Sequence, residues 1–214
     1  MSSEKSDQLL VFPLAADSIP RVVDIHVQAF PSFFLSRLGP RVLRLFYEGF
    51  LGRDDVVAIQ AVMNGRVVGV AVGPMRPDGF FKDLIRRDLI RFGFASLGFM
   101  CSHPLEISRV LRAVRYRGGS SRGEGALLSS IAVAPEYQGL GIGVALLHGW
   151  EEAARGHGCV GAQLTTDLEK NEATIEFYLR HGWQKTGSFQ TREGRKMLML
   201  SRHFDQPEME DSGG

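Results

Sequence analysis

The sequence contains little cysteine, since only Cys101 and Cys159 occur in 214 residues. Two cysteines exclude a disulfide-rich scaffold, and the absence of a CxxC pair excludes the commonest zinc-site spacing. The six histidines show no metal-ligand spacing either, so we expect no metal ion. The longest uninterrupted apolar run, Phe92–Cys101, is about half of the roughly 20 residues that span a bilayer, so we expect no transmembrane segment.

The sequence also lacks an excess of one charge. Its Lys and Arg residues number 25 and its Asp and Glu residues 24, which gives a net charge of +1 and no reason to expect a nucleic-acid partner. The N-terminal stretch MSSEKSDQ is polar and lacks the apolar core of a signal peptide, which predicts a cytoplasmic protein. Hydrophobic residues make up 44% and charged residues 23%, as in globular proteins. We expect one domain over residues 1–205 and a disordered tail at 206–214.

The clearest local signal in the first third is a hairpin. Two β-branched runs, VVAIQAVM and RVVGVAVG, flank Asn64-Gly65, and both turn residues tolerate a positive φ. Apolar spacing and Pro residues near the helix starts predict the preceding elements. These are a strand at 9–14, a helix that begins at Asp17 or Ser18, and a second helix over 39–51.

Residues 79–117 combine helical spacing of apolar residues with an excess of basic ones, and a flexible glycine-rich stretch follows them. We expect a helical insert whose apolar side covers the core. Its arginines suit a phosphorylated substrate, although a solvated basic face explains them equally. A lipid-surface role for Phe80, Phe81, Phe92 and Phe94, or a dimer contact, also remains open. The basic residues are Lys82, Arg86, Arg87, Arg91, Arg109, Arg112, Arg115 and Arg117.

The chain after the insert predicts an α/β unit. A strand is expected at Ala126–Val133, then a helix over 143–158 and a strand over 160–167. A helix capped by Asn171 and stopped by Gly182 follows, and a final antiparallel pair ends the domain.

Between the strand at 126–133 and the next helix lies the glycine segment PEYQGLGIG. A strand, a glycine turn and a helix N-terminus together form a phosphate-binding arrangement, because the first helical turn leaves backbone N–H groups unpaired. The spacing excludes the dinucleotide fingerprint, and the P-loop Gly-Lys-Ser/Thr is absent. Two explanations remain open: the glycines approach a phosphate, or they only permit tight helix–strand packing.

Two segments together decide which explanation we prefer. SSIAVAPEYQGLGIGVALL resembles the acyl-CoA-binding segment of the GNAT superfamily of N-acyltransferases, and NEATIEFYLRHGW resembles a later segment of the same family. The resemblance covers roughly residues 126–201 and implies an α/β (α+β) fold. That fold has a mixed, mostly antiparallel central sheet flanked by helices, here with the helical insert before the cofactor-binding strand. It also implies acetyl-CoA as co-substrate. The cofactor-binding residues that it implies are Ile131, Ala132, Val133, Gln138, Gly139, Leu140, Gly141, Ile142, Gly143 and Asn171.

The resemblance also suggests catalytic residues. Tyr178 matches the family's tyrosine that faces the thioester sulfur, so it is the expected acid for the departing thiolate; core packing is the alternative. The glutamate that some members carry on the cofactor strand is absent. Asp167 is the other catalytic candidate, as a base or as a site for the substrate ammonium. Ser129 or Ser130 could pass a proton through water, and His26 is expected to be a buried structural residue.

The expected acceptor is a small-molecule primary amine. AFPSFFLSRLGPRVLRLFYEGFL with LTTDLEKN resembles GNAT proteins of bacterial surface-sugar biosynthesis, which implies a nucleotide-linked amino sugar. The alternatives are a peptide N-terminus, a lysine or an aminoglycoside as acceptor, or a non-catalytic acyl-CoA-binding module. Many GNAT proteins dimerise, so a homodimer is also possible.

Overall fold

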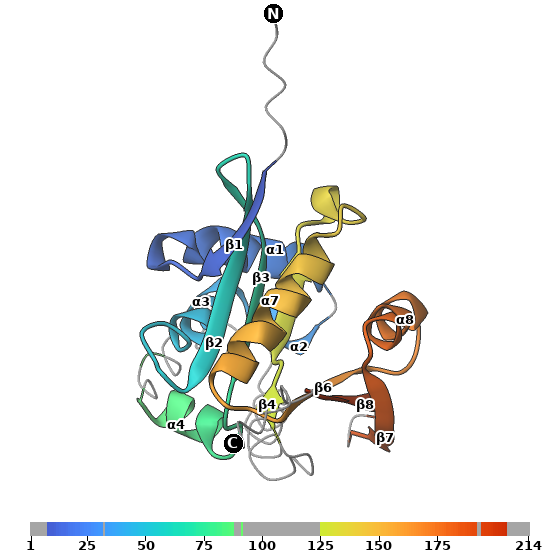
Figure 1. Cartoon of the computed structure of the whole chain (residues 1–214). Coiled ribbons are helices and arrows are strands. Elements are labelled where there is room, and N and C mark those ends of the chain that lie inside the picture. The colour runs from blue at the N-terminus through green and yellow to red at the C-terminus, as the bar shows by residue number, and fades with distance from the viewer. Residues whose placement is uncertain (1–7, 32, 88–90, 92–124, 192–193, 205–214) are drawn as a thin grey trace, which may run out of the picture.

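The computed structural model describes residues 8–31, 33–87, 91, 125–191 and 194–204 (Figure 1). Most of the insert expected at 79–117 and the tail expected at 206–214 therefore lie outside the described residues. The described helices are η1 (Ala16–Ser18), α1 (Ile19–Ala29), α2 (Phe34–Arg37), α3 (Pro40–Glu48), α4 (Phe80–Arg87), η2 (Pro135–Tyr137), α7 (Ile142–Gly156) and α8 (Glu172–Arg180). The described strands are β1 (Leu9–Pro13), β2 (Val56–Met63), β3 (Arg66–Pro74), β4 (Ala126–Leu127), β5 (Ser130–Val133), β6 (Gly161–Asp167), β7 (Gln184–Gln190) and β8 (Lys196–His203).

These strands form two four-stranded sheets, one in the order β1-β2-β3-β5 and the other in the order β4-β6-β8-β7. Among the described strands every pair is antiparallel except β4 with β6. The expected mixed, mostly antiparallel α/β fold is confirmed.

The hairpin of β2 and β3 forms where the sequence predicts it. Asn64 has a φ of 53° and Gly65 a φ of 73°, so both turn residues adopt the left-handed backbone that a two-residue turn requires. The helices expected at Ser18 and over 39–51 are present as α1 and α3, each with a proline in its first turn.

The strand expected at Ala126–Val133 is wrong as one continuous element. It is broken into β4, which pairs with β6, and β5, which pairs with β3. The switch occurs at two successive residues: the N–H of Leu128 donates to Gln163 O at 2.9 Å, and the N–H of Ser129 donates to Val72 O at 2.9 Å. The chain therefore crosses from one sheet to the other at this point, and the two sheets diverge from β4 (Figure 1).

This crossing needs Gly73. A Cβ at residue 73 would overlap the carbonyl group of Leu127 and lie 2.8 Å from the ring of Trp150. We expect Gly73→Ala to lower the free energy of unfolding by about 1–3 kcal/mol, as overpacking does. Gly156→Ala is the control, because a Cβ at Gly156 meets nothing within 4 Å. Thermal unfolding checks the prediction, and an unchanged midpoint for Gly73→Ala would contradict it.

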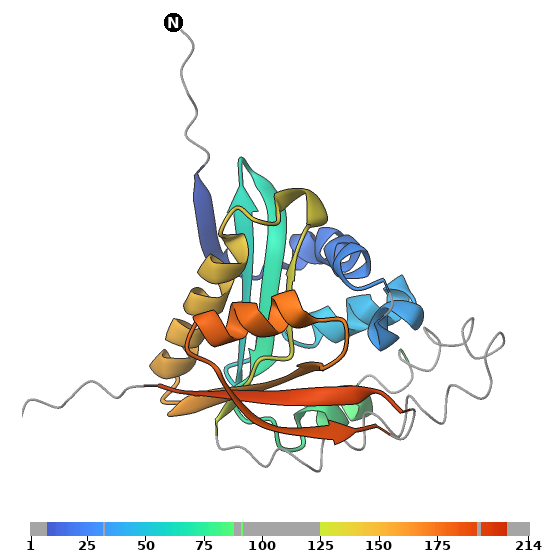
Figure 2. The same ribbon diagram turned by 90° about the vertical axis from the view of Figure 1, so that its right-hand side faces the viewer.

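Two helical layers cover the first sheet. Helix α7 lies against β2, β3 and β5, and α1 lies against β3 and β5 with α3 beside it, on the other side of the sheet (Figure 2). One core cluster joins α7 to both sheets and α8, and a second joins α1, α3 and α4 to the first sheet. The side chains of β5 alternate between the two: Ile131 and Val133 contact the first cluster, whereas Ala132 belongs to the second. Strand β5 therefore lies between the two cores.

A buried carboxylate ties α7 to the second sheet. Glu151, 1% exposed, accepts a hydrogen bond at 2.8 Å from the indole Nε1 of Trp183 and forms an ion pair at 2.9 Å with Arg202 of β8. These two partners come from the chain beyond β6, so they fix the position of α8 and β8 relative to α7, while Arg155 of α7 lies 3.8 Å from the same carboxylate. Buried charge is tolerated only when it is paired in this way.

Candidate active site

The first component of the site is the edge of β5. Residues Ile131, Ala132 and Val133 pair with β3 through one edge of the strand. No strand among the described residues pairs with the other edge, because β6 turns away with β8. An unpaired edge presents backbone N–H and C=O groups that can pair with an extended ligand.

The glycine segment forms the second component, between η2 and α7. Gly139 has a φ of 80° and Gly141 a φ of 78°, and Gly141 is the N-cap of α7. A Cβ at either residue would meet nothing within 4 Å, and one at Gly143 would touch Phe177 only at an ordinary 3.7 Å. Tight packing therefore does not explain these glycines. Gly139 and Gly141 are required by the backbone conformation, and they leave open space at the start of the helix.

The start of α7 suits an anion. The helix has 15 residues and no acidic residue in its first turn, so its unpaired N–H groups face no competing carboxylate. Leu140 is 59% exposed, whereas Ile142 is buried and anchors the helix. The Gln138 side chain donates to the carbonyl oxygen of Val133 at 3.3 Å, which links the turn to the edge of β5.

Tyr178 lies on α8 among aromatic side chains. It is 5% exposed, and its ring centroid is 5.2 Å from that of Phe177 and 5.6 Å from that of Trp183. Within the part of the chain that the structure describes, its hydroxyl makes no hydrogen bond. Burial raises the pKa of Tyr178, so the phenol is protonated at neutral pH.

Asp167, at the end of β6, is held by Arg195. The guanidinium Nη2 lies 2.7 Å from Oδ1 and 2.6 Å from Oδ2, and Nε lies 3.1 Å from Oδ1. The same guanidinium stacks over the ring of Phe33 at 5.6 Å. Both carboxylate oxygens therefore accept hydrogen bonds from the Arg195 guanidinium.

Asn171 precedes α8, but its side chain does not cap the helix. Its amide nitrogen donates to Thr166 Oγ1 at 2.8 Å and to Asp167 O at 2.9 Å. Asn171 is the N-cap residue of α8, as expected; only the side-chain capping hydrogen bond is absent, because the asparagine instead ties the end of β6 to the start of α8.

The sequence matches the acetyltransferase (GNAT) family over residues 19–183, more than half of the chain. The chain belongs to the GNAT family. It is an acetyl-CoA-dependent N-acetyltransferase, with acetyl-CoA as its co-substrate.

Solved structures with the same fold include three N-acetyltransferases. The ribosomal-protein-S18-alanine N-acetyltransferase from Escherichia coli is 16% identical with a TM-score of 0.57, over 95% of this chain and 98% of that one. The ribosomal-protein-alanine N-acetyltransferase from Brucella melitensis is 18% identical with a TM-score of 0.60, over 91% and 99%. The PaiA N-acetyltransferase from Thermoplasma acidophilum, in complex with coenzyme A, is 11% identical with a TM-score of 0.58, over 92% and 99%. Structural similarity at sequence identities this low shows only that this chain and these proteins share a fold. No curated protein matches this chain in sequence.

The described part of this GNAT chain contains no group of three or more His, Cys, Asp or Glu residues placed to hold a metal ion. Among the same residues, no helix has both the length and the apolar character to cross a bilayer. Phe80 and Phe81 are 3% and 8% exposed, so a lipid-surface role for these two is wrong; they pack beside Phe50 in the second core cluster. Phe92 and Phe94 lie outside the described residues.

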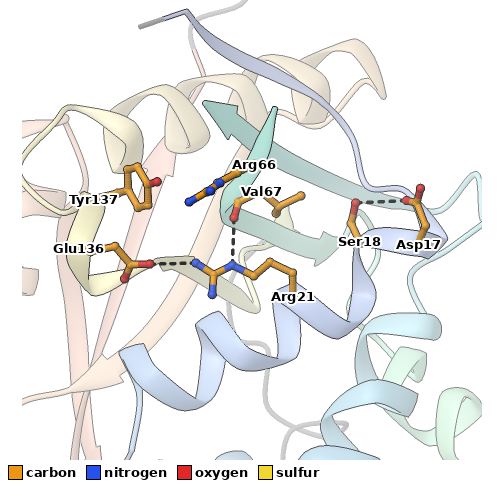
Figure 3. A pocket seen from close by; sticks show the side chains of 7 residues that line it. All are labelled: Asp17, Ser18, Arg21, Arg66, Val67, Glu136 and Tyr137. Atoms are coloured by element: carbon orange, nitrogen blue, oxygen red, sulfur yellow. Dashed lines mark hydrogen bonds and ion pairs between the residues drawn. The ribbon is translucent and has the colours of Figure 1, made fainter. Parts of the chain in front are cut away.

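A hollow of about 580 Å³ lies on the α1 side of η2 (Figure 3). Arg21 crosses it, donating to Glu136 at 2.9 Å and to the carbonyl oxygen of Val67 at 3.3 Å. None of the expected cofactor-binding or catalytic residues of this GNAT chain lines it. The expected cofactor site therefore does not coincide with this hollow.

A buried polar chain beside β5 was missed by the sequence analysis. Nδ1 of His26 lies 2.7 Å from the Tyr47 hydroxyl, which lies 3.2 Å from Oγ of Ser130. His26 and Tyr47 are 1% and 0% exposed, and Nε2 of His26 has no hydrogen-bond partner in the described residues. No motif joins residues this far apart in the sequence, so only the fold brings them together. His26 is buried as expected, but its Nε2 lacks a hydrogen-bond partner among the described residues.

Burial makes His26 a source of acid sensitivity. Burial lowers the pKa of His26 from 6.5 to about 4. Between pH 6.5 and pH 4 the unfolded chain therefore binds a proton at His26 that the folded chain does not. The free energy of unfolding should therefore fall as the pH drops from about 6.5 to about 4, by on the order of 3 kcal/mol. Denaturant unfolding at several pH values measures this fall. His26→Gln should flatten it, and equal slopes for both chains would contradict the assignment.

Proposed function

We propose that the chain moves the acetyl group of acetyl-CoA directly to a primary amine where β5 and β6 separate. The observation that carries this proposal is the pair of left-handed glycines at the start of α7, with open space in front of them. The pyrophosphate would accept hydrogen bonds from the backbone around Gly139, Leu140, Gly141, Ile142 and Gly143. Gln138 holds this turn against Val133.

The pantetheine arm would pair with the free edge of β5 at Ile131, Ala132 and Val133, as an added strand does. This pairing fixes the direction of the arm and brings the thioester towards the apex where β4 and β5 part. Asn171 contributes by holding the end of β6 and the start of α8 in place.

Tyr178 is the proposed acid. The amine attacks the carbonyl carbon, the C–S bond breaks, and the sulfur takes the phenolic proton of Tyr178. Burial keeps that proton in place at neutral pH. Asp167, with Arg195, is proposed as a binding group on the acceptor side, since Arg195 also stacks over Phe33 of the segment after α1.

The proposed acceptor is a nucleotide-linked amino sugar. In the described part of the basic stretch, α4 buries Phe80, Phe81 and Leu84 and exposes Lys82, Arg86 and Arg87. Exposed cations on a helix fixed by its apolar side suit an anionic diphosphate and would repel a polycationic aminoglycoside. We propose a cytoplasmic location to match such a substrate.

The test is thiol release from acetyl-CoA with a panel of amines: nucleotide-linked 4-amino sugars, peptides with free N-termini, peptides with lysine, and aminoglycosides. Turnover confined to nucleotide sugars supports the proposed acceptor. Turnover with peptides alone contradicts the acceptor and leaves acetyl transfer standing. Binding of acetyl-CoA without turnover of any amine in the panel contradicts the proposed acceptor and the alternatives to it.

A further inference from the structure

The buried chain of His26, Tyr47 and Ser130 ends beside the proposed reaction centre. Ser130 is the first residue of β5, directly before the proposed pantetheine track and directly after the crossing at Leu128 and Ser129. Of the three members, only Ser130 is partly exposed, whereas the other two are almost fully buried. The chain therefore reaches its surroundings at the serine.

Ser129, next in sequence, does not join this chain. Its hydroxyl lies 3.5 Å from the carbonyl oxygen of Leu127. The sequence left Ser129 and Ser130 as equal candidates for moving a proton, and the structure separates them: only Ser130 contacts a buried group that can accept one.

The surroundings of His26 contain no competing acid in the described residues. Tyr47 approaches it from α3, and the rings of Phe30 and Phe33 pack against it at 5.1 and 6.2 Å. On this side Arg195 stacks over the ring of Phe33 at 5.6 Å. No carboxylate is hydrogen-bonded to the imidazole, so a proton that reaches Nδ1 arrives through Tyr47.

Resting on the proposed function, we propose that His26, Tyr47 and Ser130 form a relay that removes the proton from the attacking amine. This relay supplies the base that the sequence lacks, since the family's strand glutamate is missing and Asp167 is engaged by Arg195. It requires the neutral His26 tautomer with its proton on Nε2, so that Nδ1 accepts from Tyr47.

The protons balance as follows. As the C–N bond forms, the amine nitrogen gives one proton to Ser130 Oγ, Ser130 gives its own to Tyr47, and Tyr47 gives its own to His26 Nδ1. As the C–S bond breaks, the sulfur takes the Tyr178 proton. His26 then returns its extra proton through the same chain to water, and water reprotonates Tyr178. At neutral pH His26 is unprotonated, because burial lowers its pKa to about 4; as so weak a base it holds the proton only while the chain passes it on.

The test compares Ser130→Ala with Ser129→Ala, its neighbour outside the chain. The probe is the amine of the panel that the unmodified chain turns over fastest, measured between pH 6 and pH 9 at low and high buffer concentration. We expect Ser130→Ala to lower kcat by about 10- to 100-fold at pH 7, as loss of general base catalysis does. Its rate should rise with the buffer base, because external base replaces the relay, whereas Ser129→Ala and the unmodified chain should show no such rise.

Two results would overturn the relay alone: equal rates for Ser130→Ala and Ser129→Ala, or a loss in Ser130→Ala that buffer base does not change. A structural role of Ser130 would produce the second result. Failure of the unmodified chain to turn over any amine would overturn the proposed function and the relay with it. Nitrogen NMR of the resting protein adds a test that needs no turnover: the relay predicts the His26 proton on Nε2, and a proton on Nδ1 contradicts it.

Discussion

Replacing Tyr178 with phenylalanine is expected to lower kcat for acetyl transfer by about 100-fold, the range of general acid catalysis. The substitution removes one buried hydroxyl and keeps the ring that packs on Phe177 and Trp183. Because that hydroxyl has no hydrogen bond among the described residues, its loss should hardly change the free energy of unfolding. Steady-state kinetics and thermal unfolding, measured on the same preparation, separate the two effects.

The control for this prediction is Tyr137→Phe. Tyr137 lies on η2, beside the glycine turn, and is only half-buried. We expect Tyr137→Phe to keep the kcat of the unmodified chain. The raised pKa of Tyr178 further predicts that kcat shows no loss from tyrosine ionisation up to about pH 10, the ordinary tyrosine pKa. An unchanged kcat for Tyr178→Phe would show that the residue only packs the core.

Replacing Gly141 with alanine is expected to weaken acetyl-CoA binding by about 10- to 100-fold, the equivalent of one lost charge-assisted hydrogen bond. The new Cβ meets no protein atom within 4 Å, so it would enter the space proposed for the pyrophosphate. Binding calorimetry with acetyl-CoA measures the effect directly. The substitution also strains a residue with a φ of 78°, which costs roughly 1–2 kcal/mol of stability.

Gly158→Ala is the matched control for that strain. Gly158 has a φ of 79° and open space around its Cβ position, but it follows the far end of α7. The two variants should lose similar stability, and only Gly141→Ala should lose acetyl-CoA affinity. Equal affinity in both would contradict the phosphate role of the turn.

Much of the fold is predictable from local patterns. The hairpin at Asn64-Gly65 and the helices that begin with Pro20 or Pro40 form where short-range rules place them, because turn conformations and helix starts depend on neighbouring residues. The break between β4 and β5 could not be predicted in this way. ALLSSIAV contains no glycine or proline that would mark a break, and the break arises because two strands distant in sequence, β3 and β6, compete for its hydrogen bonds.

In the candidate site, too, some features follow from local sequence patterns and others depend on contacts between distant elements. The glycine turn and Tyr178 belong to contiguous segments, so their place next to a strand and on a helix follows from the sequence. The pairing of Asp167 with Arg195, and of His26 with Tyr47 and Ser130, depends on contacts between remote elements. Such contacts follow from the tertiary fold, and no residue spacing reveals them.

The most direct test of the central claim is a crystal structure of the chain with coenzyme A. We expect the pyrophosphate on the backbone N–H groups of residues 139–143, the pantetheine arm along the free edge of β5, and the thiol beside the Tyr178 hydroxyl. Coenzyme A bound elsewhere, for example in the hollow between Arg21 and Arg66, with the glycine turn empty, would contradict it.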